Sequence, residues 1–150
     1  MIQEGQRLPS FRLLDDAGQP VTDADLSTGV VVLYAYPRDD TPGCTREACA
    51  FRDDLDGFTA RGARIFGLSA DDVASHAAFR AKYALPFPLI ADPAHGLCEA
   101  LGIWGEQQVQ GYRFTGIART TFILRDGHVH RVFPDVSVVG HAAEVLAALP

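Results

Sequence analysis

The stretch Val30-Val-Val-Leu-Tyr-Ala-Tyr36, followed directly by Pro37-Arg-Asp-Asp-Thr-Pro-Gly-Cys44, decides the fold of this chain. Its first part is continuously apolar and aromatic, which is typical of a β-strand buried on both faces of a sheet. The second part predicts a turn and then a helix, because Thr41 is a favoured N-cap residue and Pro42 fits the first helical position, where its missing N–H costs nothing. We therefore expect Cys44 in the first turn of a helix that follows a buried strand.

Cys44 is a candidate nucleophile because of its place on this helix. Unpaired backbone N–H groups and the positive end of the helix dipole favour the thiolate, which is the form that attacks electrophiles. Asp39 and Asp40 precede the helix, and their negative charges oppose this effect. A reactive thiolate therefore requires a cation from elsewhere in the chain. Arg119 is the candidate, because an arginine on an otherwise apolar strand is expensive to bury without a partner.

Cys49 lies five residues after Cys44 and gives an independent indication of redox chemistry. On a regular helix this separation gives about 7.5 Å of rise and roughly 140° of rotation, which places the two Cα atoms about 8–9 Å apart. A disulfide requires Cα atoms within about 7 Å, so the pair cannot bond while the helix is intact. The spacing favours a reactive pair over a static bridge: one thiolate attacks an oxidant to give a sulfenic acid, and the second thiol condenses with it after local unfolding.

The pattern Pro37-x3-Thr41-x2-Cys44 resembles the active-site signature of peroxiredoxins. The longer string that includes Cys49 resembles the peroxiredoxin Q group, also called bacterioferritin comigratory protein. The resemblance covers nearly the whole chain. Its other parts are Gly5-x3-Pro9-x-Phe11-x-Leu13 with Asp16-x-Gly18, the run from Ala91 through Cys98 to Glu106, and the run from Gly116 through Arg119 to Leu124.

This resemblance implies an α/β, thioredoxin-like fold, with a central mixed sheet flanked by helices and an N-terminal β-hairpin. It implies a thiol-dependent peroxidase for hydrogen peroxide and small organic hydroperoxides, with Cys44 as the peroxidatic and Cys49 as the resolving cysteine. Their intramolecular disulfide would be reduced by thioredoxin or a similar dithiol. By position, Thr41 would hydrogen-bond the peroxide and the sulfur, Pro37 would shield the pocket, and Arg119 would supply the cation. A guanidinium suits this role because it offers several donors in a fixed geometry and keeps its charge.

Length and composition indicate one domain over residues 1–150, because 150 residues with 47% apolar content can build one sizeable core and are too few for two ordinary domains. A net charge of −6 without a basic cluster disfavours nucleic acid or an anionic membrane as a partner. No apolar stretch approaches the roughly 20 residues that span a bilayer. The N-terminal residues lack the pattern of a secretory signal and the odd number of cysteines suits a reducing compartment, so we expect a cytoplasmic protein. We expect a monomer, with a dimer as the alternative.

Hydrophobic periodicity predicts strands that alternate with helices ahead of a terminal hairpin. This order indicates a mixed sheet covered by helices, with the Cys44 turn at the carboxyl end of a strand. A loop is predicted over residues 105–116, which are rich in glutamine and glycine. The predicted strands span residues 11–14, 19–22, 30–36, 64–69, 88–91, 120–124 and 128–133, and the predicted helices span residues 41–60, 71–83, 94–101 and 141–149.

The other residues with chemical potential have plainer interpretations. Cys98 lies in a predicted helix far along the chain and is interpreted as a buried thiol. Glu47 is expected to cap the helix or to pair with an arginine. His128 and His130 share one face of a strand but lack a third ligand, so no metal site is predicted and all the histidines are interpreted as solvent-facing. The isolated histidines are His76, His95 and His141. No dinucleotide or phosphate-binding glycine motif occurs, so no cofactor is expected and a protein or small thiol must supply the electrons.

Two other functions remain open at this point. A thiol-disulfide oxidoreductase acting on proteins would use two cysteines separated by two residues, a motif that is absent. It would reduce insulin disulfides and leave peroxide untouched. A redox-sensing or chaperone module on the same fold would not need a nucleophile, so Cys44→Ser would leave its activity intact.

Overall fold

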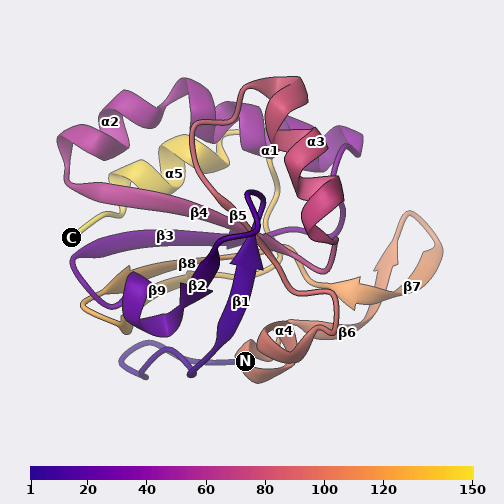
Figure 1. Cartoon of the computed structure of the whole chain (residues 1–150), viewed down its shortest axis with the longest axis horizontal. Helices are drawn as coiled ribbons and strands as arrows, with labels where there is room; N and C mark the ends of the chain where they lie inside the picture. Colours follow the sequence, from indigo (N-terminus) through magenta and orange to yellow (C-terminus); the bar gives the residue numbers. More distant parts are fainter.

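A seven-stranded mixed sheet runs through the centre of the molecule, which the computed structural model describes over residues 1–150 (Figure 1). Its strand order is β2-β1-β5-β4-β3-β8-β9, in which β3, β4 and β5 are mutually parallel and the other pairings are antiparallel. These strands are β1 (Arg12–Asp15), β2 (Pro20–Thr22), β3 (Val30–Ala35), β4 (Ala63–Ser69), β5 (Leu89–Ala91), β8 (Thr120–Arg125) and β9 (His128–Phe133). The helices are the 3-10 helix η1 (Asp23–Leu26) and the α-helices α1 (Pro42–Asp53), α2 (Leu55–Ala60), α3 (Val73–Tyr83), α4 (Gly96–Leu101) and α5 (His141–Ala147).

The central strand β3 is buried between two hydrophobic cores. Val32 and Tyr34 belong to a core that is shared with α1, α2, α3 and α5, whereas Val31 and Leu33 belong to a second core that includes α4. Figure 1 shows α1, α2 and α5 on one side of the sheet and α4 on the other. Side chains of a strand alternate between the two faces, so a strand between two cores must be apolar at every position. The continuous apolar run of β3 meets this requirement.

Most of the predicted elements are present within two residues of their predicted bounds. The predicted helix over residues 41–60 is interrupted at Asp54, which separates α1 from α2. The two predicted hairpins are confirmed, and the turn of the second has Asp126 at φ 50° and Gly127 at φ 81°, as expected for an Asp-Gly hairpin turn. None of the helices is both long enough and apolar enough to cross a membrane.

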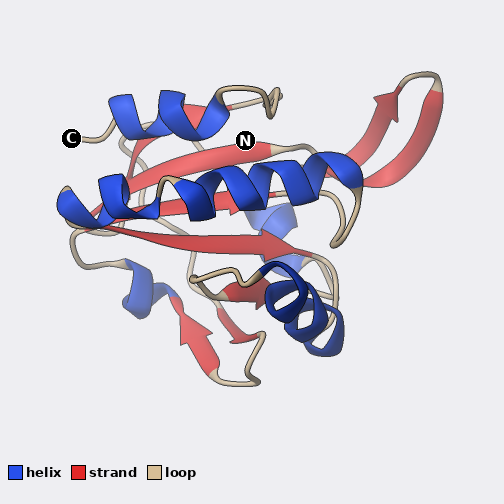
Figure 2. Ribbon diagram, turned by 90° about the horizontal axis from the view of Figure 1, so that it is seen from above, coloured by secondary structure: helices blue, strands red, loops and turns tan.

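The prediction of a loop over residues 105–116 is wrong, because β6 (Trp104–Val109) and β7 (Tyr112–Ile117) form a separate two-stranded sheet there. This hairpin projects from the rest of the molecule (Figure 1, Figure 2). Its turn residues Gln110 and Gly111 have φ of 51° and 84°, the left-handed backbone of a two-residue hairpin turn. Most of its side chains are exposed. Residues 112–115 of β7 alternate aromatic and polar residues, but Glu106, Gln107 and Gln108 of β6 are polar in a row, so the pair does not show the alternation of a half-buried hairpin in both strands.

Replacement of Gly67 by alanine is expected to lower the free energy of unfolding by about 1–3 kcal/mol, which is the usual cost of overpacking a core. Gly67 lies in β4 opposite Tyr34 of β3, and a Cβ there would lie 2.6 Å from Cδ2 of Leu89 and 3.1 Å from the hydroxyl of Tyr34. Urea denaturation measures the loss. Gly105→Ala is the control, because nothing lies within 4 Å of a Cβ at that position. An equal loss in both variants would contradict the predicted crowding.

Candidate active site

Cys44 lies in the first turn of α1, directly after the N-cap residue Thr41, as the sequence predicts. The first hydrogen bond of the helix joins the Thr45 amide to the Thr41 carbonyl at 2.8 Å. The amides of Gly43 and Cys44 donate to no acceptor in the protein, because the first amides of a helix have no partner unless a side chain caps them. These free N–H groups and the positive end of the helix dipole favour negative charge beside the Cys44 sulfur.

Arg119 contacts Cys44, at the place where the sequence predicts a cation. Its Nη2 donates to Sγ of Cys44 at 3.3 Å, and its Nη1 donates to Oε1 of Glu47 at 2.7 Å. Arg119 directly precedes β8, which pairs antiparallel with β3, so it lies at the edge of the sheet where β3 ends and the Cys44 turn begins. Gly43 leaves room for the guanidinium, because a Cβ at that position would lie 3.2 Å from Nη2.

Glu47 is the buried partner of Arg119 and lies about one helical turn after Cys44. Its side chain is 1% exposed, and its Oε2 has no hydrogen-bond partner. Burial raises the pKa of Glu47 to about 7, although the charge and the hydrogen bond of Arg119 act to lower it. The expected pairing of Glu47 with an arginine is confirmed. Because Glu47 holds one end of the guanidinium, it fixes the direction in which the other end donates to the sulfur.

The charges of Asp39 and Asp40, which oppose a thiolate at Cys44, are each paired with a residue of α3. Asp40 accepts hydrogen bonds from Nζ of Lys82 at 2.7 Å and from the hydroxyl of Tyr83 at 2.8 Å, and these bonds lower the pKa of Asp40. Asp39 is buried and lies 2.7 Å from Nδ1 of His76. Opposite charges close to both carboxylates reduce their repulsion of a thiolate.

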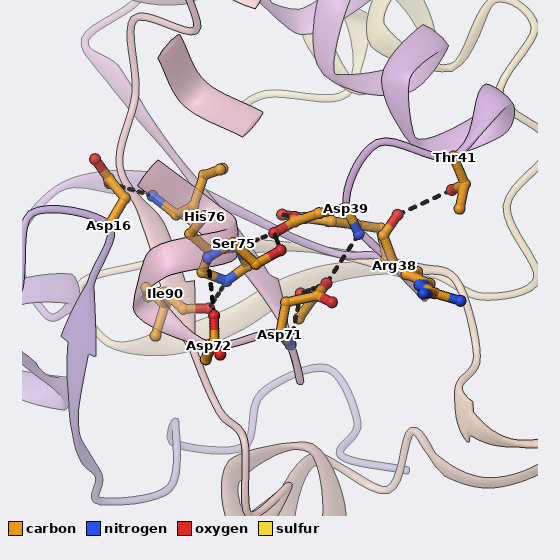
Figure 3. Close-up of polar contacts among 12 residues, drawn as sticks. Asp16, Arg38, Asp39, Thr41, Asp71, Asp72, Ser75, His76 and Ile90 are labelled. Carbon is orange, nitrogen blue, oxygen red and sulfur yellow. Dashed lines mark hydrogen bonds and ion pairs between the residues drawn. The ribbon is translucent and has the colours of Figure 1, made fainter. Parts of the chain in front are cut away.

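Thr41 and Pro37 border the turn that leads to Cys44. Oγ1 of Thr41 donates to the carbonyl oxygen of Arg38 at 2.9 Å (Figure 3). It makes no hydrogen bond to Cys44, whose sulfur accepts from Arg119. The Thr41 side chain therefore closes the turn, while its backbone is the N-cap of α1. Pro37 is half-buried just after β3. The contact of Thr41 with a peroxide and the shielding by Pro37 stay predictions.

The three cysteines are free thiols that lie in two separate parts of the fold. Cys44 and Cys49 both belong to α1, which is helical from Pro42 to Asp53, so the intact helix keeps their sulfurs apart. Cys98 belongs to α4 and to the core on the opposite face of the sheet from Cys44. Burial raises the pKa of Cys98, which agrees with its interpretation as a buried thiol.

Two histidines are buried, so the expectation that all of them face solvent is wrong. His76 is fully buried beside Asp39, and His141 is buried with its Nε2 at 2.7 Å from Oγ1 of Thr121. The buried partner of each histidine lies in a distant segment, and only His141 has a partner in its own helix as well, with Nδ1 at 3.2 Å from Oε1 of Glu144. The remaining histidines are exposed or half-buried: His95, His128 and His130.

The chain is similar to proteins of one family over nearly its full length. The profile of the AhpC/TSA family matches residues 4–132. The putative peroxiredoxin bcp of Coxiella burnetii is 42% identical over 149 residues, which are 99% of this chain and 99% of that protein. Peroxiredoxin Bcp of Bacillus subtilis is 40% identical over 149 residues, which are 99% of this chain and 95% of that protein.

A solved structure is similar to this chain in both fold and sequence. It belongs to the bacterioferritin comigratory protein of Xanthomonas campestris and is described as giving insights into the alkyl peroxide reduction activity of that protein. The TM-score is 0.85 at 39% sequence identity, and the match covers 92% of this chain and 88% of that one.

Glu47 is expected to make the stability of the fold depend on pH. Because its pKa is raised from 4.5 to about 7 in the fold, the folded state binds this proton more tightly than the unfolded state does. The resulting stabilisation is present in full below about pH 4.5 and is lost as the pH rises to about 7. Urea denaturation over this range should show that the wild type loses up to about 3 kcal/mol more than Glu47→Gln. Glu4→Gln, at an exposed position, is the control, and parallel profiles of wild type and Glu47→Gln would contradict this assignment.

Proposed function

The chain belongs to the peroxiredoxins of the AhpC/TSA family and is a thiol-dependent peroxidase, and from this premise we propose that Cys44 is its peroxidatic and Cys49 its resolving cysteine. Its mixed sheet between two layers of helices is the thioredoxin-like fold of the peroxiredoxins, which confirms the fold that the sequence resemblance implied. The proposed substrates are hydrogen peroxide and small organic hydroperoxides, and the similarity to a relative described by its alkyl peroxide reduction activity supports the second class.

In the proposed first step the Cys44 thiolate attacks one peroxide oxygen, so an S–O bond forms while the O–O bond breaks. The sulfur is oxidised to a sulfenic acid, and the departing oxygen takes a proton and leaves as water or an alcohol. Negative charge moves from the sulfur to the departing oxygen, and preorganised donors around both atoms stabilise this shift. Nη2 of Arg119 and the free amides of Gly43 and Cys44 are the donors that the chain offers there.

The observation that carries this proposal is the 3.3 Å contact between Nη2 of Arg119 and Sγ of Cys44. A guanidinium that donates to a thiol in the first turn of a helix stabilises the thiolate. A cysteine that only packs in the core is not stabilised by a charged neighbour. The second bond of Arg119, to Glu47, holds the guanidinium in place when a peroxide enters. Thr41 supplies a hydroxyl for the peroxide, and Pro37 shields the site from water.

In the second step the Cys49 thiol attacks the sulfenic sulfur, a disulfide forms and water leaves. The Cα atoms of Cys44 and Cys49 lie about 8–9 Å apart on an intact helix, and a disulfide requires about 7 Å or less. The first turns of α1 must therefore unwind, and thioredoxin or a similar dithiol then reduces the disulfide by exchange. Because both cysteines lie in one helix, a monomer can complete the cycle.

A single turnover with hydrogen peroxide tests both cysteine roles. Reduced protein is mixed with one equivalent of peroxide, trapped by alkylation within seconds and mapped by peptide mass spectrometry. We expect a disulfide between Cys44 and Cys49 in the wild type, no disulfide in Cys44→Ser, and sulfenic acid at Cys44 in Cys49→Ser. Cys98→Ser is the control and should behave as the wild type. Free thiols throughout would reject Cys44 as the nucleophile and would favour the chaperone or redox-sensing interpretation.

Arg119→Met is expected to raise the pH at which Cys44 ionises and to slow its oxidation by about 10²–10³-fold, the usual cost of losing a preorganised donor. Thiolate absorbance as a function of pH and stopped-flow oxidation by hydrogen peroxide measure the two effects. Gly43→Ala should produce smaller changes in the same direction, because its methyl group crowds Nη2 while the charge of Arg119 is kept. Arg125→Met, which removes an exposed arginine at the other end of β8, is the control. An unchanged thiol titration in Arg119→Met would remove Arg119 from its role.

A further inference from the structure

The segment that leads into the active site, residues 37–40, is fastened to α3 by hydrogen bonds that the peroxidase cycle does not use. The buried carboxylate of Asp39 accepts a hydrogen bond from the Tyr36 hydroxyl at 2.6 Å, another from Oγ of Ser75 at 2.8 Å, and a third from Nδ1 of His76 at 2.7 Å. Figure 3 shows Asp39 facing Ser75 and His76. These four residues are named the Asp39 cluster.

His76 carries a positive charge in this cluster. Its Nδ1 faces the Asp39 carboxylate, and its Nε2 faces the carbonyl oxygen of Ile90 at 2.9 Å. The carbonyl only accepts a hydrogen bond, and so does the side chain of Asp39 when it is ionised, so the imidazolium with a proton on each ring nitrogen is the form that satisfies both contacts. Burial by itself would lower the pKa of His76, but the hydrogen bond and charge of Asp39 outweigh this effect and raise it. The buried charge of Asp39 is thus paired with a buried imidazolium, and loss of either partner would leave the other uncompensated.

The backbone of the same segment is fixed as well. The amide of Asp39 donates to Oδ2 of Asp71 at 2.8 Å, and Oγ of Ser69 donates to the same oxygen at 2.6 Å. Asp39 is therefore held through its main chain from the end of β4 and through its side chain from α3. Because both attachments are buried or half-buried, the position of residue 39 is defined by the core of the protein.

The position of Asp39 determines how Cys44 meets Arg119. Thr41, the N-cap of α1, follows Asp39 by two residues, and its hydroxyl is bonded to the carbonyl of Arg38. Arg119 approaches from the other side, from the start of β8. A shift of the segment before Thr41 would carry the first turn of α1 with it and would change the contact between the Cys44 sulfur and the guanidinium. Displacements of about 1 Å in a reacting group can cost about a hundredfold in rate.

We propose that His76 is a positioning residue for the peroxide step, acting through Asp39 to hold the first turn of α1 against Arg119. This inference rests on the peroxidase cycle proposed above. His76 touches neither the peroxide nor Cys44. It sets the geometry in which the thiolate attacks, and the cluster also keeps the charge of Asp39 paired beside the thiolate.

Asp39, Asp71 and His76 also bring atoms that could bind a metal within 4.8 Å of one another. In the structure these atoms make hydrogen bonds instead, with Nδ1 of His76 facing Asp39 and Nε2 facing the carbonyl of Ile90, and a metal would have to displace a proton from the ring. The hydrogen bonds of the cluster therefore account for the presence of these groups.

Two substitutions of His76 separate its two hydrogen bonds. Asparagine has an amide nitrogen at the place of Nδ1 and keeps the bond to Asp39, whereas glutamine has one at the place of Nε2 and keeps the bond to Ile90. Each is made together with Cys49→Ser, so that the rate of sulfenic acid formation at Cys44 is measured alone by rapid quench, alkylation and mass spectrometry. We expect His76→Gln to lower the second-order rate constant with hydrogen peroxide by about tenfold or more, because it loses the hydrogen bond to Asp39. We expect His76→Asn, which keeps that bond, to lower the rate constant by about threefold or less.

Thiolate titration of Cys44 and urea denaturation accompany the rate measurements. Both variants remove the charge of His76, so both are expected to shift the Cys44 titration to higher pH, and the proposal requires a larger shift in His76→Gln, because only that variant also loses the bond that positions the first turn of α1. Equal rate constants in the two variants, or a slower His76→Asn, would overturn the proposal, because a histidine that only stabilises the fold gives no preference for the bond to Asp39. The matched controls are His130→Asn and His130→Gln, at an exposed position of β9.

Ser75→Ala keeps the proposal testable if both His76 variants fail to fold. It removes a single donor to Asp39 from a half-buried position, and a rate constant equal to that of the parent would overturn the inference. Failure of the proposed function has a different signature: the Cys49→Ser parent with an intact His76 would itself form no sulfenic acid.

Discussion

The pairing of β3 along its whole length, with β4 on one side and β8 on the other, is the constraint on which the site depends. The register that places Ala35 opposite Thr120 brings the end of β3 and the start of β8 to the same edge of the sheet. Arg119 and the turn before Cys44 therefore meet there, although 75 residues separate the arginine from the cysteine. Both strands are buried on both faces, so this register cannot slip without exposing core side chains.

Charge around the thiol is arranged in pairs. Three carboxylates lie near Cys44 in the chain, and each has its own cation from another element: Asp39 with His76, Asp40 with Lys82, and Glu47 with Arg119. A reactive thiolate can exist beside these acidic residues because a nearby cation compensates the charge of each one. Nη1 of Arg119 donates to Glu47, and Nη2 donates to the Cys44 sulfur. The site thus combines a free helix N-terminus with a cation whose direction is set by a buried carboxylate.

The errors in the predicted structure have identifiable physical causes. The hairpin of β6 and β7 pairs along its length through a left-handed turn and is mostly exposed, and the polar run from Glu106 to Gln108 in β6 gives no strand signal of its own, although residues 112–115 of β7 alternate. His76 and His141 can be buried because each has a buried partner from another segment, Asp39 for His76 and Thr121 for His141. Burial of a polar residue depends on what surrounds it in the fold, and the residues next to it in the chain carry no record of that environment.

The sequence alone determined the buried central strand, the N-cap and first turn that expose Cys44 to free amides, and the spacing that keeps Cys49 from bonding within an intact helix. These features are local, because strand burial, capping and helical spacing depend on neighbouring residues. The sequence also predicted Arg119 as the cation near Cys44, but only because it is a charged residue in an apolar run. The tertiary structure decided that Arg119 reaches both Cys44 and Glu47, that Cys98 lies on the opposite face, and that α3 holds Asp39. Those contacts join segments far apart in the chain, so they follow from strand order and packing and not from any local pattern.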